Sequence, residues 1–251
     1  MVLSKRDTTS AKLLVLNRGI ILTIVVVAIV LWGTAISLWL QVDLDKWFLI
    51  SLNGLRTNDI VTSLAQATSR YGMPFIVLVY LVYLLFAFKY ENLRDAYPVF
   101  AMVLLMFGLA GIGGDILKEI IDRPRPFVEY AGEINALSTA KTPALPSGHA
   151  TKSVALALPF LLLVAARDNW HKGVKILLAV IAFSVCCSRV LLGAHYVSDV
   201  LAGIGTALIC FPPITMLVNK ILGNMKMKTL DNAVKICGAT LVVLLVYLIL
   251  I

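Results

Sequence analysis

The sequence predicts an all-α integral membrane protein, with a six-helix transmembrane core and a probable seventh transmembrane helix at the C-terminus. Hydrophobic residues make up 60% of the 251 residues and charged residues only 14%, and the mean hydropathy is +0.91. A chain of this composition has too little polar surface to fold as a soluble globule. Apolar runs recur along its whole length, so cleavage of one N-terminal signal segment would leave the rest in the membrane.

Seven apolar segments are long enough, or nearly long enough, to cross the hydrocarbon core, which takes about 20 helical residues. They lack the alternation of apolar and polar residues that is typical of membrane barrel strands, so we expect helices. The expected segments are residues 19–40, 73–88, 98–117, 149–166, 174–193, 197–218 and 233–251.

The chain shows no internal repeat and is expected to form one membrane domain, residues 19–219. Residues 1–18 are expected to be a cytoplasmic N-terminal tail, and residues 220–251 a short linker with the extra helix. Residues 41–71 mix apolar and polar side chains, which indicates one or two short helices in the membrane interface. Residues 127–145 have no strong helix signal and are expected to form a lid or mouth loop near Arg125.

The Lys and Arg residues of the short loops predict the orientation, because cytoplasmic loops carry an excess of them. A cytoplasmic N-terminus assigns a clear majority of the 22 Lys and Arg residues to the inner loops. The loop from Lys118 to Gly148 and the turn around His195 then lie on the extracytoplasmic face. Short tails, compact length and the lack of an N-x-[ST] acceptor favour a prokaryotic inner membrane, with the endoplasmic reticulum as the alternative.

The formal charge of +8 is compatible with nucleic acid, an anionic membrane surface or an anionic substrate as partner. No nucleic-acid-binding motif or soluble basic domain is present, so nucleic acid is not expected. The sequence indicates no obligatory protein partner. The four Cys residues lie in apolar runs without C-x-x-C spacing, and we interpret them as packing residues.

The stretch KEIIDRPRP follows the third apolar segment and carries two cations near one interface. Lys118 closes the segment, and Arg125 stands on a rigid loop because Pro124 and Pro126 cannot continue a helix. Such a pair favours an anion ligand. The alternative is that both side chains only snorkel to the interface at a helix end.

The stretch PSGHATK leads into the fourth segment. Ser147 is a suitable N-cap, and the backbone N–H groups of Gly148 and His149 at a helix start favour an anion. Gly148 also allows a ligand to approach the backbone closely. The alternative is an ordinary capped helix with a polar interfacial histidine.

The stretch SRVLLGAHYVSD connects the fifth and sixth segments. His195 and Asp199 are four residues apart, so they share one helical face and the carboxylate can fix the imidazole tautomer. Arg189 ends the fifth segment, and the turn through Gly193 brings it back toward the imidazole. The alternative is a structural ion-pair network at the membrane boundary.

Together these stretches resemble the signature of the type 2 phosphatidic acid phosphatase superfamily, K-x6-RP, PSGH and SR-x5-H-x3-D. Every position of the three motifs matches, in the order that the family has them. The resemblance implies the six-helix membrane core of that family over nearly everything before Asn219. The matching residues are Lys118, Arg125, Pro126, Pro146, Ser147, Gly148, His149, Ser188, Arg189, His195 and Asp199.

The resemblance implies a phosphatase that hydrolyses a phosphate ester or pyrophosphate through a phosphohistidine. It implies that His195 attacks phosphorus, that Asp199 orients the ring, and that His149 protonates the leaving oxygen and then activates water. The implied substrate phosphate-binding residues are Lys118, Arg125, Ser147, Gly148 and Arg189.

No metal ion and no cofactor is expected. Of the three His residues, two have implied roles, and His171 lies in a predicted cytoplasmic loop across the membrane from them. Neither H-E-x-x-H nor a paired-Asp motif is present.

A membrane lipid phosphate in the bilayer is the expected substrate: undecaprenyl pyrophosphate, phosphatidylglycerol phosphate, phosphatidic acid or a lipid A phosphate. One alternative is a lipid phosphotransferase of the same superfamily, which moves phosphate from a polyprenyl pyrophosphate to an acceptor lipid. Another is a transporter or scaffold with a phosphate pocket but no turnover. Lys152, one turn after His149, either contacts a second phosphate or snorkels.

Overall fold

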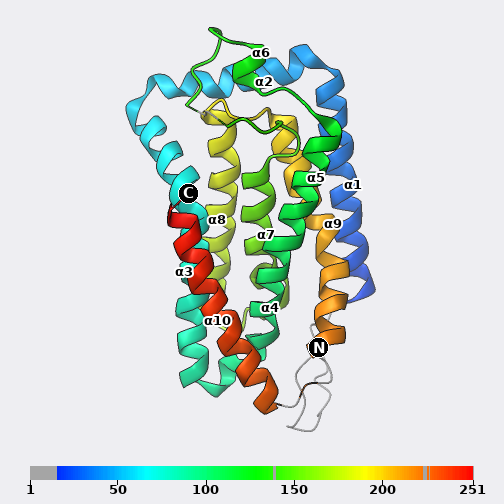
Figure 1. The fold of residues 1–251 in the computed structure, drawn as a ribbon, viewed down its shortest axis with the longest axis vertical. Coiled ribbons are helices and arrows are strands. Elements are labelled where there is room, and N and C mark those ends of the chain that lie inside the picture. The colour runs from blue at the N-terminus through cyan, green and yellow to red at the C-terminus, as the bar shows by residue number, and fades with distance from the viewer. Residues whose placement is uncertain (1–15, 138–139, 223–224, 226, 251) are drawn as a thin grey trace.

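The computed structural model describes residues 16–137, 140–222, 225 and 227–250. The predicted N-terminal tail, residues 1–18, therefore lies almost wholly outside the described residues. The described chain is a bundle in which the long helices run along the longest dimension of the molecule (Figure 1). Its elements are α1 (Arg18–Leu40), α2 (Val42–Gly54), η1 (Leu55–Thr57), α3 (Asp59–Lys89), η2 (Glu91–Ala96), α4 (Tyr97–Leu105), η3 (Met106–Ala110), α5 (Gly111–Ile121), α6 (Pro126–Glu129), α7 (Gly148–Leu163), α8 (Asn169–Leu191), α9 (Val197–Leu222) and α10 (Met227–Leu250).

The all-α membrane fold predicted from the sequence is confirmed. Within the described ranges, six helices are long and apolar enough to cross a membrane, and α7 is a shorter apolar helix. Each of the seven predicted segments corresponds to one of these helices or to the continuous run α4–η3–α5. The chain is thus a multi-span membrane protein.

The second span begins earlier than predicted. Helix α3 starts at Asp59 rather than at Met73, because the Asn58 side chain accepts hydrogen bonds from the N–H groups of Ile60 and Val61 and so caps it. Of the one or two interfacial helices expected in residues 41–71, one is present as α2. It lies across the end of the bundle (Figure 1).

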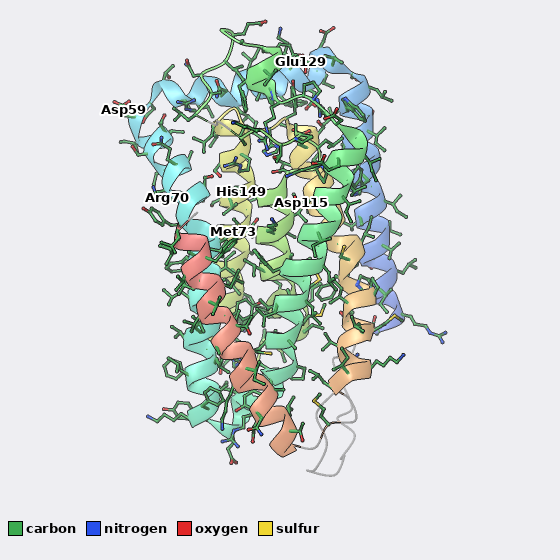
Figure 2. The ribbon with its side chains drawn as sticks, in the orientation of Figure 1. Asp59, Arg70, Met73, Asp115, Glu129 and His149 are labelled. Atoms are coloured by element: carbon green, nitrogen blue, oxygen red, sulfur yellow. The ribbon has the colours of Figure 1, made fainter. Side chains whose placement is uncertain are left out.

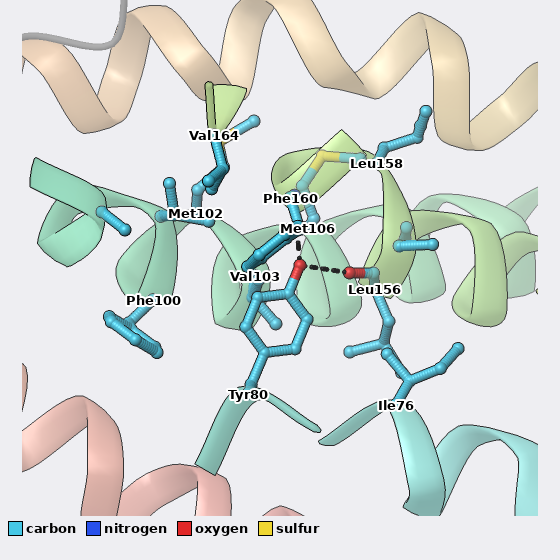
Figure 3. Packing of buried hydrophobic residues seen from close by; sticks show 14 of the residues in the cluster. Ile76, Tyr80, Phe100, Met102, Val103, Met106, Leu156, Leu158, Phe160 and Val164 are labelled. Carbon is cyan, nitrogen blue, oxygen red and sulfur yellow. Dashed lines mark hydrogen bonds between the residues drawn. The ribbon is translucent and has the colours of Figure 1, made fainter. Parts of the chain in front are cut away.

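Helix α7 is the central helix of the bundle. It contacts α3, α4, α5, α8, α9 and η3, and most of its side chains are buried. Pro159 lacks an N–H group and interrupts the helix ladder. The Tyr80 hydroxyl bridges the ladder at this point, donating to the Leu156 carbonyl oxygen at 2.8 Å and accepting from the Phe160 N–H at 3.2 Å (Figure 3).

The third span changes its winding near its middle. Residues Met106–Ala110 form a π-helical turn between α4 and α5. Such turns insert one residue into a helix and are frequent at functional sites. Helix α5 then ends at Asp122, which adopts a left-handed conformation with φ of 48° and donates its N–H to the Lys118 carbonyl oxygen.

The extra helix α10 lies obliquely against α3 and α4 (Figure 1). Gly238 allows a close approach, because a Cβ atom there would lie 2.8 Å from Leu84 Cδ2. Much of the remaining surface of α10 is apolar and exposed. The helix thus packs on the outside of the bundle, where its buried Leu230, Val234 and Leu241 join the main apolar cluster.

We expect the Tyr80 bridge to stabilise the centre of the bundle. Tyr80→Phe leaves one carbonyl and one N–H group of α7 unsatisfied in an apolar surrounding, so unfolding should become easier by about 1 kcal/mol or more. Thermal unfolding of the purified protein in detergent measures the change. Tyr247→Phe, on the exposed surface of α10, is the matched control, and equal melting temperatures of the two variants would contradict the assignment.

Candidate active site

The three polar stretches predicted from the sequence meet at the end of the bundle that carries α2. Lys118 lies in the last turn of α5, His149 in the first turn of α7, and Asp199 in the first turn of α9. Figure 2 labels His149 and Asp115 in this half of the molecule. The three stretches therefore converge at one end of the bundle.

The imidazole of His195 is held between a carboxylate and a guanidinium. Its Nδ1 lies 3.3 Å from Asp199 Oδ2 and its Nε2 lies 3.3 Å from a terminal nitrogen of Arg125. A guanidinium only donates, so Nε2 is the acceptor and Nδ1 carries the proton toward Asp199. This tautomer leaves the Nε2 lone pair beside a cation that can hold a phosphate oxygen.

His195 is 2% exposed and lies in the turn between α8 and α9. Burial, followed by the charges of Arg189 and Arg125, lowers the pKa of His195 well below its ordinary value. The ring is therefore neutral near pH 7. A neutral imidazole with a fixed tautomer is the form that a nucleophile requires.

Arg125 is buried and held in place by the loop that follows it. Its Nε donates to the Thr142 carbonyl oxygen at 2.6 Å, and a terminal nitrogen donates to Thr142 Oγ1 at 3.0 Å. The other terminal nitrogen donates to the Ala194 carbonyl oxygen at 3.1 Å. Thr142 of the expected lid thus holds the guanidinium on one side, and Ala194 of the His195 turn holds it on the other.

Lys118 and Arg189 supply two further buried cations. A Cβ atom built on Gly148 would lie 3.1 Å from Lys118 Nζ, which places the ammonium against the start of α7. Arg189 donates from one terminal nitrogen to Ser69 Oγ of α3. Sequence analysis did not identify Ser69, because it lies in a part of α3 that was expected to be interfacial.

Ser147 differs in part from expectation. It occupies the N-cap position of α7, but its side chain makes no capping hydrogen bond, and its backbone N–H donates to the Asp199 carbonyl oxygen at 2.9 Å. That N–H is therefore engaged within the protein and is not available to a phosphate. Within the described part of the chain, the buried Ser147 Oγ and Arg189 Nε have no hydrogen-bond partner.

His149 is half-buried in the first turn of α7, where backbone N–H groups have no helical acceptor. Arg189 and Lys118 act electrostatically on this ring, as they do on the ring of His195. The two histidines therefore belong to one electrostatic cluster. An anion there would face two imidazoles and the unpartnered donors of Ser147 and Arg189.

A third arginine, which the motif analysis did not single out, organises the buried charges. Arg123 donates to Asp199 Oδ1 at 2.8 Å, to Asp45 Oδ2 at 2.9 Å and to Ser198 Oγ at 2.6 Å. Ser198 also donates its backbone N–H to Asp45 Oδ1 at 3.2 Å. The guanidinium lies 3.8 Å over the centre of the Tyr196 ring. The only sequence signal was the position of Arg123 between Lys118 and Arg125.

The loop after α5 is fastened to α2 and α9 on its outer side. Tyr196 donates to Glu129 Oε2 at 2.6 Å, and Lys46 forms an ion pair with Glu133 at 2.8 Å. The Asn53 side chain accepts from the Asn135 N–H at 2.9 Å and donates to the Leu191 carbonyl oxygen at 2.8 Å. Residues 129–135 of the expected lid are thus held by specific contacts.

No group of three or more His, Cys, Asp and Glu side chains in the described ranges has an arrangement suited to a metal ion. The side chains that face the His195 ring are cations and donors, and Asp199 is already engaged by Arg123 and His195. This donor set suits an anion such as phosphate. Lys152, the further candidate, lies with its Nζ 3.7 Å from Asp115 Oδ2.

We expect Asp45 to position Asp199 and His195 through Arg123. Asp45→Asn leaves Arg123 with Asp199 as its one carboxylate partner, which draws Asp199 away from His195. A weakened charge-assisted bond corresponds to a loss of about tenfold in kcat with little change in KM. The acid limb of the pH–rate profile should also move to lower pH, because Asp199 then stabilises a protonated His195 less.

Asp43→Asn, on the exposed side of α2, is the matched control and should behave as wild type. A purely structural role of Asp45 would lower the amount of folded protein without moving the pH profile. An unchanged profile would therefore contradict the positioning role.

Comparison with known proteins identifies relatives over most of the described helices. The family model described as PAP2 superfamily matches residues 98–221, which include all three motifs but not α10. Phosphatidylglycerophosphatase B of Bacillus subtilis (strain 168) is 29% identical over 165 residues, covering 61% of this chain and 71% of that protein. A putative undecaprenyl-diphosphatase, YbjG of Escherichia coli (strain K12), is 28% identical over 167 residues, covering 59% and 79%.

The fold has a counterpart among solved structures. The crystal structure of a transmembrane PAP2 type phosphatidylglycerolphosphate phosphatase from Bacillus subtilis superimposes with a TM-score of 0.57 at 23% identity. The match covers 80% of this chain and 96% of that chain. At this identity the likeness establishes the fold.

Proposed function

We propose that this chain, which matches the PAP2 superfamily model over residues 98–221, is a lipid phosphatase of that superfamily that uses His195 as its nucleophile. The observation that carries the proposal is the His195 ring itself, with Nδ1 directed at Asp199 and Nε2 beside Arg125. Phosphoryl transfer requires positioning and neutralisation of charge on the equatorial oxygens. The cluster of Lys118, Arg125 and Arg189 provides both.

In the first step, His195 Nε2 attacks phosphorus and the bond from phosphorus to the leaving oxygen breaks. His149 donates a proton to that oxygen, and the lipid product departs. Asp199 offsets the positive charge that develops on the His195 ring. The unpartnered donors, Ser147 Oγ and Arg189 Nε, are suited to the equatorial oxygens.

In the second step, water attacks the phosphorus of the phosphohistidine. His149, now neutral, accepts a proton from this water, the bond from phosphorus to Nε2 breaks, and inorganic phosphate is released. His195 returns to its neutral tautomer with Asp199 as acceptor. The donors on the oxygens are cations and N–H or O–H groups of the chain, so the mechanism requires no metal ion.

The proposed substrate is a lipid with a phosphate headgroup. The cluster lies at one end of the spans, beside the interfacial helix α2 (Figure 1). A lipid can therefore place its phosphate at headgroup depth while its tail stays in the bilayer. The names of the relatives, phosphatidylglycerophosphatase B and putative undecaprenyl-diphosphatase, agree with this class. The distribution of Lys and Arg supports an extracytoplasmic site in an inner membrane.

Phosphate release from lipid phosphates in detergent micelles tests the proposal. Wild type is expected to release inorganic phosphate, and His195→Ala to lose essentially all of this activity because no other group takes the place of the nucleophile. His171→Ala is the matched control, since His171 is also buried but bonds to Asp168 at the other end of α8. It should retain activity.

The same assay distinguishes the proposed mechanism from metal-dependent hydrolysis and from phosphotransfer. Activity in excess EDTA is expected to equal that without it, and loss that Mg²⁺ or Zn²⁺ restores would contradict the metal-independent mechanism. Labelled phosphate that appears on an added acceptor lipid instead of in solution would reassign the chain to phosphotransfer. No release by wild type from any lipid phosphate would reject the enzymatic function.

The covalent intermediate has a separate test. His149→Ala removes the base that activates water, so the phosphoenzyme should form from a substrate with a good leaving group and then persist. Rapid quenching with labelled substrate, followed by peptide mapping, should locate acid-labile phosphate on His195. Label on another residue, or none above the wild-type level, would contradict the proposed nucleophile.

A further inference from the structure

We propose that Lys152 binds the second phosphate of a lipid diphosphate, in a subsite that Gly111 and Asp115 shape. The inference rests on the proposed phosphatase function and names the class of headgroup that the site prefers. It is carried by the side-chain contacts of these three residues.

Lys152 follows His149 by one turn on α7, so the two side chains lie on the same side of the helix. The three residues from His149 to Lys152 correspond to a rise of about 4.5 Å along the axis, so the ammonium is within reach of a group bound beside His149. The Lys152 and Lys118 ammonium groups both act electrostatically on His149. Lys152 therefore lies next to the phosphate cluster, on the side that leads into the bilayer.

Asp115 joins the two lysines. Its Oδ1 lies 3.5 Å from Lys118 Nζ and its Oδ2 lies 3.7 Å from Lys152 Nζ. Two ammonium groups share one carboxylate, so the trio keeps a net positive charge. The Lys152 side chain is 32% exposed and that of Asp115 is 56% exposed. A long, half-exposed ion pair of this kind leaves the ammonium accessible to an anionic ligand.

Gly111 makes room for the lysine stem. A Cβ atom at this position would lie 2.8 Å from Lys152 Cε, closer than side chains tolerate. The glycine directly follows the π-helical turn Met106–Ala110, which carries Phe107 below the ammonium at 5.9 Å. By contrast, a Cβ atom on Gly113 would meet nothing within 4 Å. The space at Gly111 is thus specific to Lys152.

The cost of a charge in a membrane span also favours a functional role. A lysine within a span is expensive unless it lines a polar site or extends to the interface. Here the ammonium is turned toward Asp115 and the phosphate cluster. A monophosphate is satisfied by Lys118, Arg125 and Arg189, whereas the lipid-linked phosphate of a diphosphate adds negative charge that Lys152 offsets. Lys152 would also stabilise the lipid monophosphate as it leaves.

The test compares farnesyl diphosphate with farnesyl monophosphate, which share one tail. Lys152→Ala should lower kcat/KM for the diphosphate by about tenfold to a hundredfold, the effect of one lost charge-assisted contact. The value for the monophosphate should stay within about twofold. Lys175→Ala, a lysine of α8 that donates to the Leu161 carbonyl oxygen, is the control and should leave the ratio of the two values unchanged.

A second pair of variants tests the geometry without removing a charge. Gly111→Ala should displace the Lys152 stem and, like Lys152→Ala, lower the ratio of kcat/KM for the diphosphate to kcat/KM for the monophosphate. Gly113→Ala should keep the wild-type value of this ratio. Both changes add one methyl group to α5, so the difference between the kcat/KM ratios of the two variants reports the contact with Lys152. This pair also covers the case in which Lys152→Ala fails to fold.

Three results would overturn the subsite. Equal losses on both lipids in Lys152→Ala would assign the lysine to general charge balance, and no loss on either would leave it as a snorkelling residue. Equal kcat/KM ratios in Gly111→Ala and Gly113→Ala would show that the contact between Gly111 and Lys152 does not shape the subsite. If wild type releases phosphate from both lipids, each of these rejects the subsite alone. If it releases phosphate from neither lipid, the proposed function fails and the subsite with it.

Discussion

The bridge that Arg123 makes between Asp45 and Asp199 holds the polar end of the bundle together. Two buried carboxylates near one another would repel strongly in a surrounding of low dielectric constant. The guanidinium neutralises them, and Ser198 completes its hydrogen bonds. Because Asp199 in turn accepts from His195, the orientation of the imidazole depends on this bridge. Helix α2, which carries Asp45, is thereby connected to the His195 ring.

The spans themselves could be predicted well, because each apolar run must form a helix in lipid. The start of α3 could not be predicted by hydropathy, since residues 59–72 continue the helix beyond the apolar run. The capping pair Asn58–Asp59 was the available signal. Helix α7 was predicted from its apolar run, but its central place in the bundle could not be predicted. It is too short to stand out by length, and its central place follows from packing on all sides rather than from its hydropathy.

Local spacing predicted the contact of His195 with Asp199, because four residues on a helix fix the geometry. It could not predict that Arg123 reaches Asp45, since 78 residues separate them and only the folded chain brings them together. For the same reason the bond from the Ser147 N–H to the Asp199 carbonyl oxygen was missed. Motifs thus identified the groups suited to substrate, whereas the contacts that hold those groups came from the fold.

Hydrogen bonding separates the structural cations from those suited to a ligand. Arg123 has its terminal nitrogens engaged by Asp45, Ser198 and Asp199, so it has little capacity left for a phosphate. Arg189 keeps Nε unpartnered within the described part of the chain. A buried donor without a partner costs free energy, about 1–3 kcal/mol, which a ligand can recover on binding. The same bundle end therefore contains one satisfied guanidinium that positions the histidine and one unsatisfied guanidinium ready for the anion.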